Sequence, residues 1–69
     1  MENNELYIMY LKKGEYVLFT SMNGSTNKGK ILDNYNNGEF RVEYQNGTKE
    51  EIIGVEQILF YVGNDGSEQ

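Results

Sequence analysis

The sequence predicts an all-β domain, a small and strongly bent barrel of five short strands. Asn-Gly pairs at 37–38 and 46–47 are typical of hairpin turns, because both residues tolerate the positive φ angles of tight turns. Between these turns, Phe40, Val42 and Tyr44 alternate with charged residues, which is the period of a half-buried strand. A length of 69 residues suits a single domain.

The other elements follow from short β-rich segments separated by polar ones. Residues 22–27 are small and polar and are expected to form a loop, and 54–57 is long enough for only one 3₁₀ turn. The last segment is apolar and is expected to be a largely buried strand. The five predicted strands are residues 15–20, 28–35, 39–44, 48–53 and 58–62.

The N-terminal segment 5–12 fits two structures. Leu6, Met9 and Tyr10 share one face of a helix, whereas Leu6, Ile8 and Tyr10 share one face of a strand. We favour a short helix or turn that packs on the open end of the barrel. The expected organisation is an N-terminal appendage over 1–13, the barrel over 14–62 and a flexible tail over 63–69.

The composition excludes several classes of protein. The chain contains neither Cys nor His, which removes disulfides, the usual zinc ligands, thiol nucleophiles and imidazole acid–base catalysis. Glu50 and Glu51 are adjacent acids, but neighbours in a strand point to opposite faces and do not form a catalytic pair. We therefore expect no enzyme activity, no metal and no cofactor.

Targeting signals are not expected either. No basic region precedes an apolar run of signal-peptide length, and no apolar stretch approaches the roughly 20 residues of a membrane span. We expect a cytoplasmic protein with no membrane partner.

Several short motifs have the pattern of a known barrel. They are Gly29–Leu32, Gly38–Tyr44, Gly47, Glu50 and Ile58–Leu59. With these motifs, the chain from Gly14 to Leu59 resembles the SH3-like barrels, and within them the Tudor-like group.

This resemblance implies a binding function. Tudor-like domains hold methylated side chains in a cage of aromatic rings through cation–π attraction. Tyr44 falls where the family often places one cage aromatic, and Tyr35 is a second candidate, so the resemblance implies a reader of a methylated or cationic peptide. Alternation along the strand instead places Tyr44 in the core beside Phe40 and Val42.

Charge is distributed unevenly along the chain. Residues 1–30 hold four basic and three acidic side chains, whereas residues 31–69 hold eight acidic and two basic ones, and the net charge is −5. A balance this acidic argues against direct binding of nucleic acid. An acid-rich face serves either solubility or the binding of a basic protein.

Our main hypothesis is a non-catalytic, acidic protein-binding module. Its acidic face would mimic the phosphates of DNA and occupy a basic groove of a nucleic-acid-binding host protein, as an inhibitor of the kind that a phage makes. The apolar N-terminal segment and last strand would also leave an exposed edge that favours a homodimer or pairing with a partner. The candidate partner-binding residues are Asp33, Glu39, Glu43, Glu50, Glu51 and Glu56.

Overall fold

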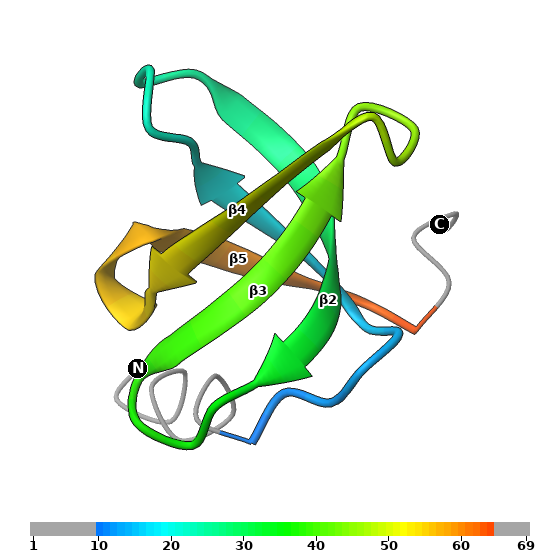
Figure 1. The fold of residues 1–69 in the computed structure, drawn as a ribbon, viewed down its shortest axis with the longest axis vertical. Coiled ribbons are helices and arrows are strands. Elements are labelled where there is room, and N and C mark those ends of the chain that lie inside the picture. Colours follow the sequence, from blue (N-terminus) through cyan, green and yellow to red (C-terminus); the bar gives the residue numbers. More distant parts are fainter. Residues whose placement is uncertain (1–9, 65–69) are drawn as a thin grey trace.

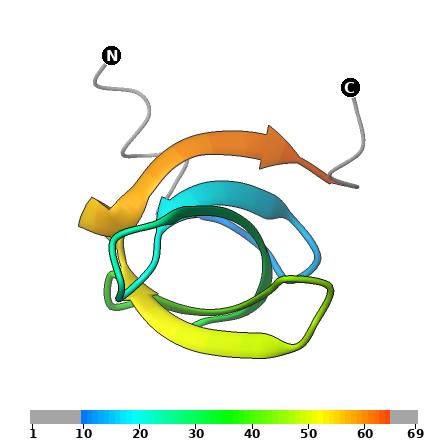
Figure 2. The same cartoon turned by 90° about the horizontal axis from the view of Figure 1, so that it is seen from above.

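The computed structural model describes residues 10–64, which form one antiparallel sheet (Figure 1). The strand order is β4-β3-β2-β1-β5, so β4 and β5 are the edges within the described residues. Seen from above, the strands curl around a common centre, and β4 and β5 lie on opposite sides without pairing (Figure 2). The all-β, five-stranded prediction is confirmed, and the sheet is curled but not closed. The elements are β1 (Tyr16–Thr20), β2 (Thr26–Asn34), β3 (Glu39–Tyr44), β4 (Lys49–Gly54), η1 (Val55–Gln57, a 3₁₀ turn) and β5 (Ile58–Gly63).

The core fills the inside of the curl. In β3, Phe40 and Val42 are buried as the alternation predicts, while Tyr44 is half-buried and packs against the cluster. Removal of these apolar side chains from water is the main force that holds so small a sheet in its bent form. The buried hydrophobic residues are Leu11, Val17, Phe19, Ile31, Phe40, Val42, Ile53 and Ile58.

The two Asn-Gly turns have the expected backbone. Gly38 has a φ of 92° and Gly47 a φ of 81°, in the region that an L side chain rarely adopts. Asn46 also has a positive φ of 59°. The antiparallel pairing of β3 with β2 and with β4 confirms the two hairpins and gives their register.

Two element predictions are wrong. Residues 26–27 were expected to lie in a loop, but Thr26 pairs with Thr20 and begins β2. Thr26 is itself a strand-favouring residue, and Asn27 pairs with Phe19 despite the low β-propensity of Asn. The last strand was expected to be largely buried, but Leu59, Phe60 and Tyr61 are exposed. Among the described residues, β5 pairs only with β1, so only Ile58 of this strand reaches the core.

The expected helix or turn over 5–12 lies mostly outside the described residues. Its described part, residues 10–12, is not helical. Leu11 is buried in the core, and its carbonyl accepts a hydrogen bond of 2.8 Å from Nδ2 of Asn34. Leu11 therefore belongs to the core of the sheet, although it lies in the segment 1–13 that is expected to be an appendage.

Within residues 10–64, no helix has the length and apolar character needed to cross a membrane.

Candidate protein-binding surfaces

The outer side of β3 carries its charged residues. Because Phe40 and Val42 point inward, Glu39, Arg41 and Glu43 point outward. Arg41 lies opposite Asp33 of β2 and Ile52 of β4, and Glu43 lies opposite Lys30 of β2 and Glu50 of β4. A register irregularity between Ile31 and Asp33 moves Asp33 onto the same side of the sheet as Arg41.

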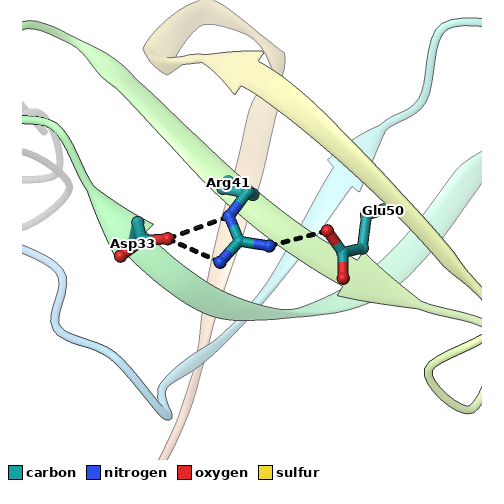
Figure 3. Close-up of polar contacts among 3 residues, drawn as sticks. All are labelled: Asp33, Arg41 and Glu50. Carbon is teal, nitrogen blue, oxygen red and sulfur yellow. Dashed lines mark hydrogen bonds and ion pairs between the residues drawn. The ribbon is translucent and has the colours of Figure 1, made fainter.

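Arg41 joins three strands through its guanidinium group (Figure 3). Its Nε and Nη2 each lie 2.8 Å from Oδ2 of Asp33, and its Nη1 lies 2.7 Å from Oε1 of Glu50. The hydrogen bonds to Asp33 and to Glu50 raise the pKa of Arg41 above its usual value. Ion pairs this exposed contribute little to stability. The effect of these ion pairs is instead to hold the carboxylates of Asp33 and Glu50 at fixed places on the surface.

We use the term acidic face for the outer side of β2, β3 and β4 around Arg41. Ile52 lies within it, opposite Arg41, and is 55% exposed. Sequence reasoning did not single out Ile52, because strand alternation alone does not say which of Ile52 and Ile53 faces the core. The acids of this face are Asp33, Glu39, Glu43 and Glu50.

Two of the six predicted acids lie elsewhere. Glu51 is opposite Val42, so it points to the inner side of β4, away from Glu50. Glu56 belongs to η1, where its carboxylate lies beside the backbone of Gly54. The structure thus brings together Asp33, Glu39, Glu43 and Glu50 and leaves out the other two.

Lysines limit the acidic face on the β2 side. Lys28 and Lys30 lie on the outward positions of β2, and the ammonium group of Lys28 is 5.9 Å from the ring centroid of Tyr16. They line a shallow groove of about 470 Å³ together with Tyr16 and Glu43. The spacing of the lysines in the sequence does not predict this groove, because the groove depends on the curl of the sheet across β1, β2 and β3.

Tyr44 closes one end of the curled sheet. Its ring meets Phe19 edge-on, with the centroids 5.2 Å apart. Its hydroxyl donates a hydrogen bond of 2.8 Å to Oε1 of Glu51, and this bond raises the pKa of Tyr44. Tyr44, Glu51 and the exposed Met22 line a second shallow groove, of about 390 Å³, between β4 and the β1–β2 loop.

Tyr35 does not lie near this groove. Its amide bonds to the carbonyl of Glu39 at the start of β3, whereas Tyr44 ends the same strand. Glu39 and Tyr44 are five residue steps apart in an extended strand, which corresponds to roughly 17 Å. The two tyrosines therefore do not form one aromatic cage.

Carboxylates do not gather as metal ligands among residues 10–64, where no three acidic side chains converge. The comparisons add no functional information, since no protein-family model, curated protein or solved structure matches the chain. The function is therefore inferred from the surfaces themselves.

Proposed function

We propose that this chain is a non-catalytic binding module with an SH3-like, Tudor-like barrel that docks its acidic face on a basic surface of another protein. One observation carries the proposal: Asp33, Glu39, Glu43 and Glu50 share one side of three neighbouring strands. The strand order and the 3₁₀ turn before the last strand support the barrel assignment.

The acidic face has the composition of a recognition surface. Ile52 supplies an apolar contact on the edge strand β4, and it lies opposite Arg41 and near the carboxylates that flank this arginine. Arg41 already orders Asp33 and Glu50, so less side-chain entropy is lost when a partner binds. A partner with lysines or arginines around an apolar contact would match this arrangement.

The partner class follows from the charge. A protein that binds nucleic acid offers a basic groove, and fixed carboxylates compete there with phosphates. The proposed activity is therefore inhibition by occupation of that groove, as a phage protein would inhibit a host protein.

The test is affinity capture with a matched pair of variants. Glu43→Lys and Glu56→Lys change the net charge equally, but only Glu43 lies on the acidic face. We expect a basic protein to be retained by wild type and by Glu56→Lys, to be lost with Glu43→Lys, and to be displaced by duplex DNA. Equal retention by all three proteins would refute the proposal.

A second candidate function is the reading of a methylated or cationic peptide. The groove beside Tyr44 favours it, because an aromatic ring and the thioether of Met22 suit the stem of a lysine side chain. The carboxylates of Glu50 and Glu51 also outnumber the one cation of the lining, Lys49. This candidate predicts that a trimethyllysine peptide shifts the amide resonances of Met22 and Tyr44, and that Tyr44→Ala abolishes the shifts. The acidic-face proposal predicts no preference for the methylated form.

A further inference from the structure

Strand β5 is an apolar edge without charged residues. Leu59, Phe60 and Tyr61 follow one another and are 57%, 62% and 44% exposed. Within residues 10–64, β5 pairs with β1 on one side only. Exposed edges in soluble proteins usually carry charges or Pro that prevent pairing, and the sequence of β5, ILFYVG, has neither.

We propose that β5 is the contact surface of a homodimer, in which two copies meet through β5 around a two-fold axis. An uncharged apolar strand is complementary to itself, as a two-fold interface requires. The inference does not depend on the function proposed for the acidic face.

The distribution of charge is compatible with a second copy as the occupant, although the net charge itself opposes association. The net charge of −5 makes two copies repel each other unless their acids are kept apart. The opposite edge, β4, carries Glu50 and Glu51, whereas β5 lies on the other side of the curl (Figure 2). Contact through β5 therefore places the two acidic faces on the outside of the dimer.

The polar end of Tyr61 fits a buried position. Its hydroxyl donates a hydrogen bond of 3.0 Å to Oε2 of Glu15 in the same chain. The hydroxyl therefore keeps its acceptor when a partner covers the ring. A hydroxyl left without an acceptor is the usual obstacle to burying a tyrosine.

The size of the patch predicts a weak dimer. Phe60 lies opposite Leu18 and Tyr61 opposite Val17, so these two rings project to opposite sides of β5. Even together, the exposed parts of the three large side chains amount to only roughly 300 Å² per copy, well below the ~800 Å² of a standard interface. Register irregularities lie at both ends of the β1–β5 pairing and limit the length of a backbone ladder between copies. Side-chain contacts of Leu59 and Phe60 would therefore provide most of the binding energy.

Sedimentation velocity of the full chain at rising protein concentration tests the dimer. We expect the wild-type sedimentation coefficient to rise toward that of a dimer, and Phe60→Lys to remain monomeric. Met22→Lys is the matched control, because Met22 is 86% exposed, lies in the β1–β2 loop rather than on β5 and gains the same charge. Circular dichroism of each variant separates loss of association from loss of folding.

Added salt gives an independent result. Screening weakens the repulsion between acidic copies, so salt should strengthen an apolar dimer. Association that weakens with salt, or that Met22→Lys removes as well as Phe60→Lys, would overturn the proposal. A wild-type protein that remains monomeric at every concentration would overturn it as well.

Discussion

The ring of Phe19 packs directly against the backbone of Gly29, where a β-carbon would lie 2.6 Å from Cε1 of the ring. Gly29 lies between Val17 of β1 and Tyr44 of β3 in the sheet. Because Gly29 has no side chain, the Phe19 ring reaches Tyr44, whose hydroxyl in turn bonds to Glu51. One glycine thus links the core to the groove at the end of the sheet.

Gly29→Ala should destabilise the fold, because the new methyl group meets a buried aromatic ring that has no room to move. Overpacking of this kind typically lowers the free energy of unfolding by about 1–3 kcal/mol. Gly54→Ala is the control: its β-carbon would also lie 2.6 Å from its nearest atom, but that atom is the mobile carboxylate end of Glu56. Urea unfolding should show a clear loss for Gly29→Ala and almost none for Gly54→Ala. Equal losses would mean that the Phe19 ring does not occupy this position.

Phe40→Ala should remove much of the stability of the domain. Phe40 is 1% exposed, and truncation of a buried phenylalanine usually lowers the free energy of unfolding by about 3–5 kcal/mol. Small domains have a total stability of only about 5–15 kcal/mol, so a large unfolded population is expected at 37 °C. Ile52→Ala, on the exposed side of β4, should melt close to wild type. A thermal melt of Phe40→Ala that matches wild type would contradict the assignment of the core.

The Tyr44–Glu51 hydrogen bond predicts a loss of stability at alkaline pH. The bond raises the pKa of Tyr44 in the folded state above the value of about 10 in the unfolded chain. The stabilisation is therefore complete below pH ~10 and is lost as the pH rises through the folded pKa. Tyr44→Phe should remove one late-titrating phenol from the absorbance titration and should flatten this part of the pH dependence of unfolding. If the phenol lost in Tyr44→Phe is one that titrates at the ordinary pKa of tyrosine, the bond is absent in solution.

Local patterns predicted β3 and its two turns because those signals are contained in a few neighbouring residues. Alternation decides which side of β3 is buried, and the Asn-Gly pairs decide where it starts and ends. The assignments of Thr26 to a loop and of Phe60 to a buried strand are wrong because they depend on distant parts of the chain. Their surroundings depend on which strand lies beside them, and a short segment carries no information about its distant neighbour.

The sequence likewise predicts one part of the candidate site and not the other. Alternation correctly separates Glu50 from Glu51, but it does not say which of them joins Glu43. The register between β3 and β4 decides this, and it places Glu50 beside Glu43. The role of Arg41 as a bridge between Asp33 and Glu50 depends on an irregularity in β2 that has no signature in the sequence.

The most direct measurement of the central claim is the affinity of the captured basic partner at several salt concentrations, for wild type, Glu43→Lys and Glu56→Lys. Charge–charge attraction is strongest at low salt, because the Debye length is about 30 Å at 0.01 M and about 10 Å at 0.1 M. The acidic-face account predicts that Glu43→Lys binds most weakly relative to wild type at low salt, with the difference narrowing as salt rises. Glu56→Lys should follow wild type. Binding that is independent of salt and unaffected by Glu43→Lys would contradict the account, and so would equal weakening by both variants.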